Sequence, residues 1–399
     1  MKTEKVSNAS FLEEFTSYES RKSGGEGNHK ARELICRTLS QLPGDSLKMT
    51  EESFPISYCT QVHSSVTTAG LTIKTKLLEY TGQECEEFAE ALISVGYGSS
   101  LEFKLRNVHG CIAVCKANPC IHRADQTKNA LRAGARALLI ISPHEEYFHV
   151  GACQSGSSPI LKMPVMSIRG KDWQQLKSHL GKKVMLSYAR TSSSAEGVNL
   201  VVDINNSPES MCTVMGAHYD SWGAGAQDNG IGVLMLIRFI ECFVQEKHKG
   251  NFRFIFFDGE ELGMLGSKWH VENNNIECYN VFFNLEMPLP AKGTYLKTLL
   301  FSFSTIKHIP FFSLLAKSYL PCPLNPYYSL CSSTLPMDAD AFMKSGIPSI
   351  STYCNNPYYH TPADSPRNIR MDQFNTMLSL YKSIITSISQ ESFLKRDAR

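Results

Sequence analysis

The sequence lacks a long hydrophobic run and an excess of charge of one sign. Its 399 residues contain no stretch of the roughly 18 apolar residues that a membrane-spanning helix needs. The longest candidate, 232–244, carries Arg238 and Glu241 and is better interpreted as a buried helix. The formal net charge is only +2, so no strong field attracts nucleic acid or an anionic membrane. We therefore expect neither a membrane span nor a nucleic-acid partner.

The sequence also lacks a recognisable leader and two common catalytic motifs. Its start, MKTEKVSNASFLEEF, has no apolar core like that of a secretory signal. Together with an odd number of cysteines, 13, this favours a cytoplasmic location, whereas a missing leader would indicate a secreted or lumenal protein. Neither the G-x-S-x-G motif of serine hydrolases nor a P-loop is present.

The composition and periodicity are those of a globular protein with two domains. Hydrophobic residues make up 42% of the chain and charged residues 20%, unlike a disordered protein. Two domains are expected at this length. A predicted helix at 29–42 precedes a β-rich stretch, 66–189, which contains one helical run at 126–137. The segment TSSSAEG (191–197) then has the composition of a linker.

Strands and helices alternate from residue 199 onward. This alternation predicts an α/β fold with a central, mostly parallel or mixed β-sheet flanked by helices. The expected strands are 212–217, 252–257, 280–285 and 347–352. The expected helices are 232–245, 262–272, 311–319 and 372–389.

Ionisable residues gather just after these strands or in the loops that follow them. Alone, Asp228 would be a helix N-cap, and Glu260 with Glu261 a solvated pair. A lone His360 in a loop would be a surface residue. Open α/β sheets, however, bind ligands beyond the carboxyl ends of their strands, and the shared location points to one site. The full set is His218, Asp220, Asp228, Glu260, Glu261, Glu286 and His360.

Two histidines and three carboxylates of this set form a ligand mix that suits zinc. One carboxylate exceeds what a single tetrahedral ion requires, so the pattern predicts two ions that share a bridging ligand, as is common in aminopeptidases. Of Glu260 and Glu261, one can bind metal while the other moves protons. Asp220 is placed to accept a hydrogen bond from a ring nitrogen of His218 and to fix its tautomer.

The ordered motifs resemble the zinc aminopeptidase and glutamate carboxypeptidase family of co-catalytic metallopeptidases over about 199–366. These motifs are HYD (218–220), DN (228–229), EE (260–261), NLEM (284–287) and YHTPAD (359–364). The resemblance implies two zinc ions per chain. The implied ligands are His218 and Glu286 for one ion, Glu261 and His360 for the other, and Asp228 as the bridge. It also implies a hydroxide between the ions, Glu260 as general base, and Tyr359 as a stabiliser of the oxyanion.

Two positions depart from the family pattern. Glu286 stands where many members have Asp, which keeps the carboxylate, so metal binding is still expected. MDADAFMKSGIPSI (337–350) is similar to a common S-D-H-x-x-F…G-I-P segment but has Ala339 where His is usual. That His is not a zinc ligand, so the change affects the expected substrate contacts rather than metal binding.

The β-rich middle of the chain resembles the protease-associated domain that many of these peptidases carry as an insertion. The similar segments are GCIAVCK (110–116), NALRAGARALLIIS (129–142) and PVMSI (164–168). The resemblance implies that 1–65 is the N-terminal part of the peptidase domain, 66–190 the insert and 191–399 the catalytic domain.

Two other metal-like patterns are set aside. In HEEYFH (144–149) the histidines are five residues apart instead of four, so a helix would not place both on one face. We expect a solvated loop there. The cluster of Cys111, Cys115, Cys120 and His122 contains no C-x-x-C pair. Buried thiols, or a disulfide in a secreted protein, are expected instead.

The function expected from these features is the hydrolysis of short peptides or dipeptides by a zinc-dependent exopeptidase, most simply an aminopeptidase, which is the broader class. Three alternatives stay open: a dipeptide or glutamate carboxypeptidase with the same metal centre, a glutaminyl cyclase-like acyltransferase with one zinc, and a receptor-like binding protein without catalysis. The full ligand set and Glu260 favour the peptidase. No sequence signal indicates the oligomeric state, the role of the insert or the preferred side chain.

Overall fold

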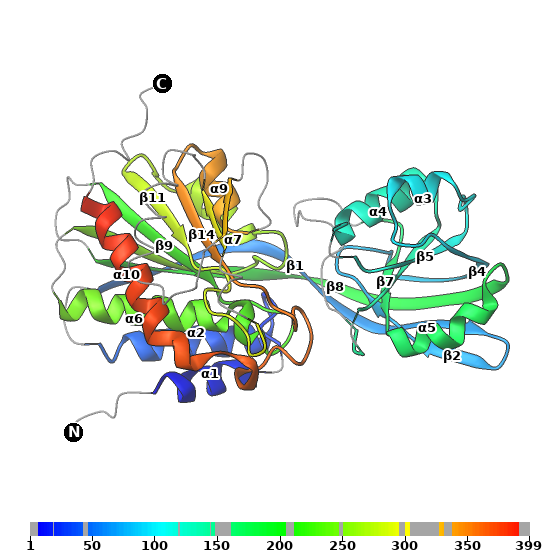
Figure 1. Ribbon diagram of the computed structural model, residues 1–399, viewed down its shortest axis with the longest axis horizontal. Coiled ribbons are helices and arrows are strands. Elements are labelled where there is room, and N and C mark those ends of the chain that lie inside the picture. The colour runs from blue at the N-terminus through cyan, green and yellow to red at the C-terminus, as the bar shows by residue number, and fades with distance from the viewer. Residues whose placement is uncertain are drawn as a thin grey trace. The chain divides into compact units, whose positions relative to one another are not determined.

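The computed structural model describes residues 7–18, 20–42, 47–118, 120–143, 145–147, 161–204, 211–246, 250–294, 300–303, 327–330 and 337–390. The chain divides into two compact units, coloured by residue number in Figure 1. The first comprises Met1–Ile56, Glu196–Glu260 and Met264–Arg399. The second comprises Ser57–Ala195 and the short segment Glu261–Gly263. The predicted insert, 66–190, falls within the second unit, and its exact limits stay a prediction.

The first unit is built on a mixed β-sheet, as the sequence predicts. Four neighbouring strands run parallel, in the order β14 (Ser349–Tyr353), β11 (Tyr279–Asn284), β9 (Cys212–His218), β10 (Asn251–Phe257). β8 (Lys183–Ile204) pairs antiparallel with β10. On the other side β12 (Leu300–Phe303) pairs antiparallel with β14 and parallel with β13 (Tyr327–Leu330). The carboxyl ends of the four parallel strands therefore meet at one edge.

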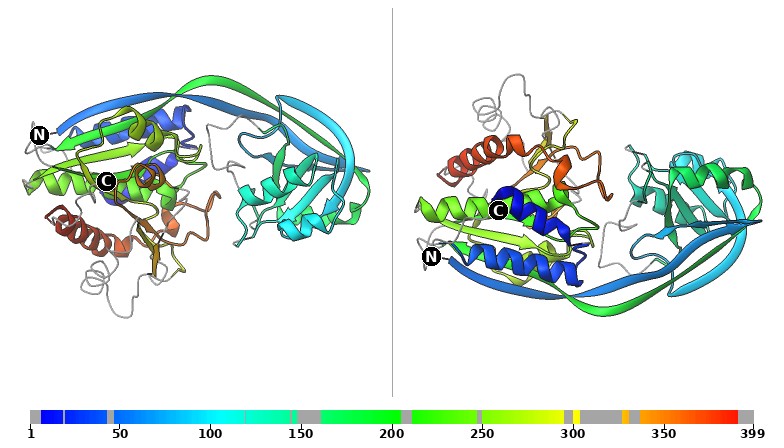
Figure 2. Two further views of the ribbon diagram at one scale, coloured as in Figure 1. Left: turned by 90° about the horizontal axis from the view of Figure 1, so that it is seen from above. Right: turned by 90° about the horizontal axis from the view of Figure 1, so that it is seen from below.

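Helices cover this sheet on both faces (Figures 1 and 2). Successive strand residues point to opposite faces, so Met215 of β9 joins one hydrophobic core and Val214 the other. The core around Met215 is closed by α1 (Asn8–Ser17), α2 (Glu26–Leu39), α6 (Ile231–Gln245) and α10 (Phe374–Gln390). The core around Val214 includes residues of α7 (Leu265–Asn273) and α9 (Ala339–Lys344).

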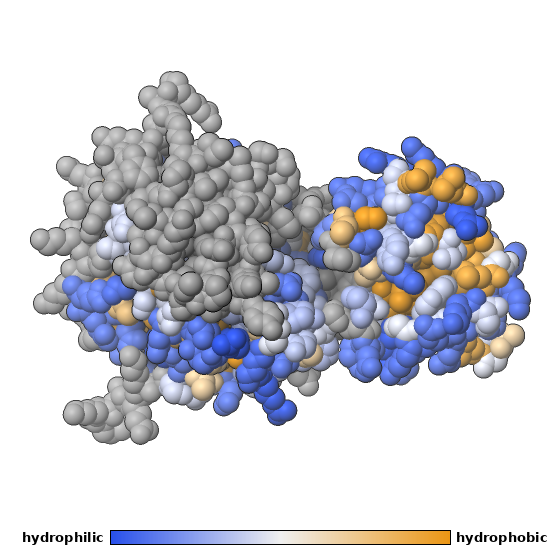
Figure 3. All heavy atoms as spheres, viewed as in Figure 1, coloured by the Kyte–Doolittle hydropathy of each residue, from blue (hydrophilic) through white to orange (hydrophobic). Residues whose placement is uncertain are grey.

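The second unit contains its own parallel strands, in the order β4 (Cys85–Ser94), β5 (Ile112–Lys116), β6 (Ala137–Ile141), β7 (Val165–Ile168). β3 (Lys76–Leu77) pairs antiparallel with β7, and β2 (Leu71–Lys74) pairs with β1 (Leu47–Thr68). Its helices are α3 (Ser100–Lys104), α4 (Arg123–Arg132) and α5 (Gly170–Leu176). Two cores of its own hold it together. Hydrophobic residues also reach its surface (Figure 3), among them Leu101 and Leu105.

Three sequence expectations differ from the structure. The predicted linker 191–197 does contain the boundary between the two units, at Ala195 and Glu196, but it lies inside the 22-residue strand β8 instead of forming a loop. Most of its side chains are exposed, so no alternating pattern marked the strand, which is held by backbone pairing. Helix α1 and most of strand β1 were not predicted. The helix predicted at 126–137 is α4, and residues from Ala137 onward form β6.

Two further expectations concern helices. The helix predicted at 311–319 lies outside the described residues. Within the described part of the chain, no helix combines the length and the apolar character that a bilayer crossing needs.

Candidate metal centre

The parallel strands deliver the candidate ligands to one edge of the first unit's sheet. His218 is the last residue of the fully buried strand β9. Glu286 follows β11 by two residues, and His360 lies in the loop after β14. Asp228 lies in an irregular turn before α6, with φ −113° and ψ 85°, instead of capping the helix. Sequence positions that are far apart therefore meet because four strand ends share this edge.

One group of ligands consists of His218, Asp228 and Glu286, all buried. Nε2 of His218 lies 3.3 Å from Oδ1 of Asp228 and 3.6 Å from Oε1 of Glu286. One donor atom from each of the three residues lies within 4.8 Å of the other two, which is the spacing of ligands around one metal ion.

A second group consists of Asp228, Glu261 and His360, again with donor atoms within 4.8 Å of one another. Nε2 of His360 lies 3.1 Å from Oδ2 of Asp228. Asp228 thus belongs to both groups and directs one carboxylate oxygen towards each histidine. A carboxylate in this position can bridge two ions.

Unsatisfied buried atoms indicate that a cation fits here. Nε2 of His218, Oδ2 of Asp228 and Oε2 of Glu286 are buried and make no hydrogen bond. Buried polar atoms are nearly always paired in folded proteins, and unpaired ones call for an ion or water. Nitrogen and carboxylate oxygen donors suit zinc. Among the described residues, the two groups above are the only sets of three such side chains close enough to hold a metal.

The electrostatics of the site also favour a cation. Burial alone would lower the pKa of His218, but the carboxylates of Glu286, Asp220 and Asp228 outweigh burial and raise it. Burial raises the pKa of Glu286. For Asp228, burial opposes ionisation, yet the two neighbouring histidines outweigh it and lower the pKa. A bound cation stabilises both the neutral histidines and the charged carboxylates.

Asp220 lies behind His218, where the sequence predicts a residue that orients the ring. Nδ1 of His218 is 3.1 Å from the backbone oxygen of Asp220 and 3.5 Å from its carboxylate. These contacts occupy Nδ1 and leave Nε2 facing the other ligands. The carboxylate also accepts hydrogen bonds from the backbone N–H of Glu260 at 3.2 Å and from Ser23 at 3.3 Å. Asp220 therefore connects the first histidine to the turn that carries Glu260.

The turn after β10 presents Glu260 and Glu261. Gly259 has φ +72°, a left-handed conformation that favours glycine. The buried Asp258 accepts hydrogen bonds from the N–H groups of Gly259 and Val198 at 2.9 and 3.0 Å. Tyr359, the other predicted catalytic residue, is partly exposed, and its ring stacks on that of His360 with centroids 3.6 Å apart.

Three buried residues near the ligands had no assigned role in the sequence interpretation: Arg21, Asp338 and Asp364. Asp364 is the last residue of the YHTPAD motif, and this position was the only indication of a role for it in the sequence.

Asp338 directly precedes Ala339, and burial raises the pKa of Asp338 to about 7. Ala339 itself is fully buried in the core around Val214, where a larger polar side chain would not be accommodated without change. Arg21 lies outside every periodic segment of the sequence, so no pattern indicated that it is buried.

The two patterns set aside above lie in the second unit. His144 and residues 148–149 of HEEYFH are outside the described residues. Cys115 is buried, Cys111 is partly buried and Cys120 is exposed, and all three are free thiols. Burial raises the pKa of Cys115, which makes it a poor metal ligand.

Comparison with known proteins agrees with this geometry. Residues 199–385 match the family model "Peptidase family M28", and residues 74–176 match the "PA domain" model. The chain therefore has one region similar to peptidases of this family and a second region similar to protease-associated domains. The peptidase match includes every candidate ligand, and the protease-associated match lies within the second unit.

The chain is similar in sequence to curated aminopeptidases. It is 26% identical over 245 residues to "Probable lipoprotein aminopeptidase LpqL" of Mycobacterium tuberculosis, covering 58% of this chain and 48% of that protein. It is 29% identical over 168 residues to "Aminopeptidase YwaD" of Bacillus subtilis, covering 41% of this chain and 36% of that protein. The chain thus spans about half or less of the length of these relatives.

Solved structures share the fold over nearly the whole chain. An aminopeptidase from Aneurinibacillus sp. strain AM-1 has a TM-score of 0.72 at 20% identity and covers 99% of this chain and 97% of its own. BSAP, a zinc aminopeptidase from Bacillus subtilis, has a TM-score of 0.75 at 20% identity, with coverage of 98% and 96%. At these identities the likeness shows the fold.

Proposed function

We propose that this chain is a two-zinc exopeptidase, most simply an aminopeptidase, that hydrolyses short peptides. One observation carries the proposal: Asp228 presents one carboxylate oxygen to each of two histidines, 3.3 and 3.1 Å away. A single-ion site has no use for a carboxylate shared in this way. The names of the relatives support the aminopeptidase direction.

The residues that would hold the ions fall into the two groups described above. His218 and Glu286 would hold one ion, Glu261 and His360 the other, with Asp228 between them. Zinc supplies a Lewis acid for the scissile carbonyl and lowers the pKa of bound water to about 7. Glu286 is one methylene longer than the aspartate that is usual at its position, and it still reaches the His218 ring.

Glu260 would act as the general base. Its backbone N–H is held by Asp220, which also contacts His218, so the base and the first ligand share one support. Glu260 takes the proton of the attacking water and passes it to the leaving amine. Tyr359, stacked on His360, would donate a hydrogen bond to the carbonyl oxygen as negative charge develops on it.

Three alternatives share parts of this site. A dipeptide carboxypeptidase would use the same ligands with a different substrate orientation. A glutaminyl cyclase-like acyltransferase would need one zinc, which leaves the second group, with Glu261 and His360, unexplained. A receptor-like protein would have no reason to keep both groups together with Glu260.

The test combines metal content with cleavage of aminoacyl fluorogenic amides and free dipeptides, with and without a chelator. About two zinc ions per chain and chelator-sensitive release of the N-terminal residue are expected. Release of a C-terminal residue would reassign the direction. Cyclisation of an N-terminal glutamine peptide without cleavage would support the acyltransferase. No bound zinc and no cleavage after zinc addition would refute the proposal.

A further inference from the structure

The loop that carries Asp220 and Asp228 has no regular structure to satisfy its backbone. Gly225 has φ +49°, and the backbone angles of Asp228 and Asn229 are not helical. Irregular buried backbone needs hydrogen-bond partners from elsewhere, because an unpaired buried N–H or C=O costs about as much as a lost hydrogen bond. Residues 226–230 are all buried, so water cannot supply every partner.

Arg21 satisfies the carbonyl side of this loop. Its side chain is fully buried, and its guanidinium donates hydrogen bonds to the backbone oxygens of Tyr219 at 2.8 Å, Ala224 at 2.5 Å and Gly225 at 3.0 Å. It also stacks on the ring of Phe15, 4.3 Å from the centroid, which fixes its plane to α1. Three donors in one plane hold the two ends of the loop segment 219–225 together.

Asp364 satisfies the amide side of the same loop. Its carboxylate is buried and accepts hydrogen bonds from the N–H of Gln227 at 2.7 Å and of Asp228 at 3.1 Å. Its backbone oxygen accepts a third bond, from the N–H of Ala226, at 3.2 Å. Nδ2 of Asn356 donates to the carboxylate at 3.1 Å and holds it in place. Asp364 thus accepts a hydrogen bond from the backbone of Asp228, the bridging residue itself.

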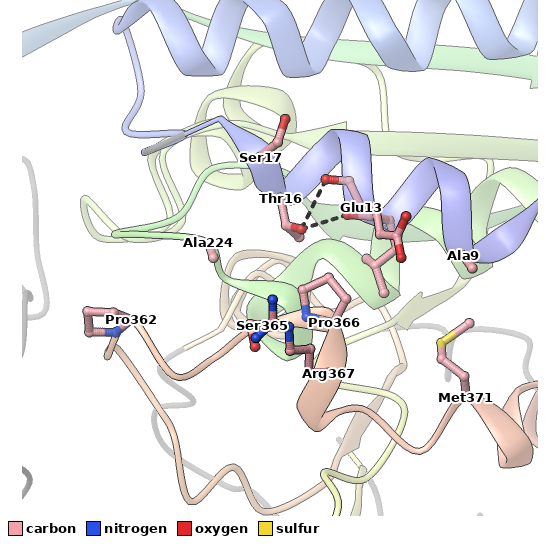
Figure 4. Close-up of a pocket in the computed structure, with 11 residues that line it drawn as sticks. Ala9, Glu13, Thr16, Ser17, Ala224, Pro362, Ser365, Pro366, Arg367 and Met371 are labelled. Carbon is pink, nitrogen blue, oxygen red and sulfur yellow. Dashed lines mark hydrogen bonds between the residues drawn. The ribbon is translucent and has the colours of Figure 1, made fainter.

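The loop is not packed on every side. A pocket of about 600 Å³ lies between α1 and residues 362–371, and Ala224 of the loop forms part of its wall. Figure 4 shows Ala224 between Thr16 of α1 and Pro362. Because side chains leave this space open beside Ala224, packing does not fix the loop on that side, and the hydrogen bonds from Arg21 and Asp364 supply the constraint there.

We propose that Arg21 and Asp364 are positioning residues for the bridging metal ligand. They fix the backbone on both sides of Asp228, so that its two carboxylate oxygens face His218 and His360 at the same time. The proposal rests on the proposed two-zinc centre. A bridge is more sensitive to displacement than an ordinary ligand, since a shift that favours one ion moves the carboxylate away from the other. Loss of either positioning residue therefore weakens both ions together.

The first test is Asp364→Asn, with Asp372→Asn as the matched control. Asparagine keeps the size but places an NH₂ group against backbone N–H groups, whereas Asp372 lies on the surface in an ion pair with Arg370. Zinc affinity is measured by competition with a chromophoric chelator, without any peptide substrate. Asp364→Asn should weaken both zinc ions by about 10- to 100-fold, as loss of outer-sphere partners does. Asp372→Asn should bind zinc like wild type.

Two further variants keep the proposal testable. Asn356→Ala leaves the carboxylate of Asp364 in place but removes one donor to it, together with the acceptor of the Tyr358 N–H, so it should lower the affinity by a few fold without unfolding the protein. Arg21→Lys keeps the charge but loses the planar fork and should weaken both ions. The matched control, Arg37→Lys, changes an exposed arginine paired with Glu14 and should bind zinc like wild type. Wild-type affinity in Asp364→Asn and Asn356→Ala would overturn the positioning role. A wild-type chain without zinc would instead refute the two-zinc centre itself.

Discussion

Asp228 shows at the scale of a single residue how the site depends on a few buried atoms. Its two oxygens face different histidines, and its backbone N–H is held by Asp364. The next residue, Asn229, reaches across to the turn that carries Glu286: its amide donates to the oxygen of Leu285 at 2.7 Å and accepts from the N–H of Met287 at 3.2 Å. Asp228 therefore belongs to both groups of ligands, and its neighbour Asn229 ties the same backbone to the segment that carries Glu286.

Glu260→Gln should abolish most of the turnover while zinc binding persists. The amide cannot take a proton from water, and removal of a general base typically costs about 100- to 10,000-fold in rate. The measurement is kcat for an aminoacyl amide together with zinc content. Glu277→Gln, on an exposed loop, is the control and should behave as wild type. A zinc-free Glu260→Gln protein would show that Glu260 has a structural role instead.

Gly232→Ala should destabilise the protein, although alanine usually stabilises a helix by about 1 kcal/mol relative to glycine. A Cβ atom here would collide with Oδ1 of Asn229 and lie 2.6 Å from the oxygen of Leu285. Overpacking of this kind costs about 1–3 kcal/mol. Denaturant unfolding measures the change. Gly223→Ala, where a Cβ meets nothing within 4 Å, should be neutral, and equal effects at both positions would contradict this explanation.

The sequence indicated which ionisable residues lie together at the sheet edge, but not the residues that hold their backbone in place. His218, Glu286 and His360 could be predicted because each follows an apolar strand of a parallel sheet, and such strand ends converge. Arg21 and Asp364 could not, since they act on backbone atoms, and backbone partners leave no pattern in the side chains. The role of every predicted ligand stays a prediction until metal is measured.

The same distinction applies to secondary structure elements. Apolar runs identified β9, β10, β11 and β14 to within two residues of their observed ends. Segment 191–197 carries small polar side chains exposed to solvent, so composition indicated a linker where backbone pairing makes a strand. For α1, Phe11, Leu12 and Phe15 have helical spacing, and Ser7 caps the helix, yet ten residues are too few for a periodic signal to stand out.

Strand β1 and helix α7 are joined by a buried polar contact with a pH-dependent strength. Oε2 of Glu52 lies 2.9 Å from Nδ1 of His270, whose Nε2 lies 2.9 Å from the hydroxyl of Tyr279. Burial opposes ionisation of Glu52, but hydrogen bonds from His270, Asn199 and Asn274 outweigh it and lower its pKa below the usual 4.5. A lowered pKa in the folded state stabilises the fold above pH 4.5, and this contribution is lost as the pH falls.

Glu52→Gln should therefore reduce the free energy of unfolding at pH 7, by about 1.5–3 kcal/mol, the range for hydrogen bonds to charged groups. The difference from wild type should shrink as the pH falls below 4.5. Both proteins are unfolded by urea without metal, so that loss of zinc at low pH does not contribute. Glu51→Gln, a half-exposed neighbour on β1 paired with Arg32, should change stability by less than about 0.5 kcal/mol. A constant difference at all pH values would exclude the ionised Glu52 as its source.

At the scale of the whole molecule, zinc should stabilise the first unit and leave the cores of the second unchanged. Every candidate ligand except Glu261 belongs to the first unit, while residues 57–195 of the second unit contain two cores of their own and no candidate ligand. A ligand present at 1,000 times its Kd stabilises the folded state by about 4 kcal/mol. Chelation should therefore speed hydrogen exchange around 212–236 and 354–364, while β5 and β6 exchange at the same rate. Equal acceleration in both units would show that they unfold together.

The order of the chain also bears on how the protein is made. Almost the whole second unit, 57–195, leaves the ribosome before His218, so it can fold while no zinc ligand yet exists. At about 5–20 residues per second, the ligands from His218 to His360 follow over about 7–28 seconds. Phe11, Leu12 and Phe15 of α1 are made much earlier and remain uncovered until the α6 residues that pack on them have been made. Helix α1 is thus open to a chaperone for longer than a helix whose partners are made immediately after it.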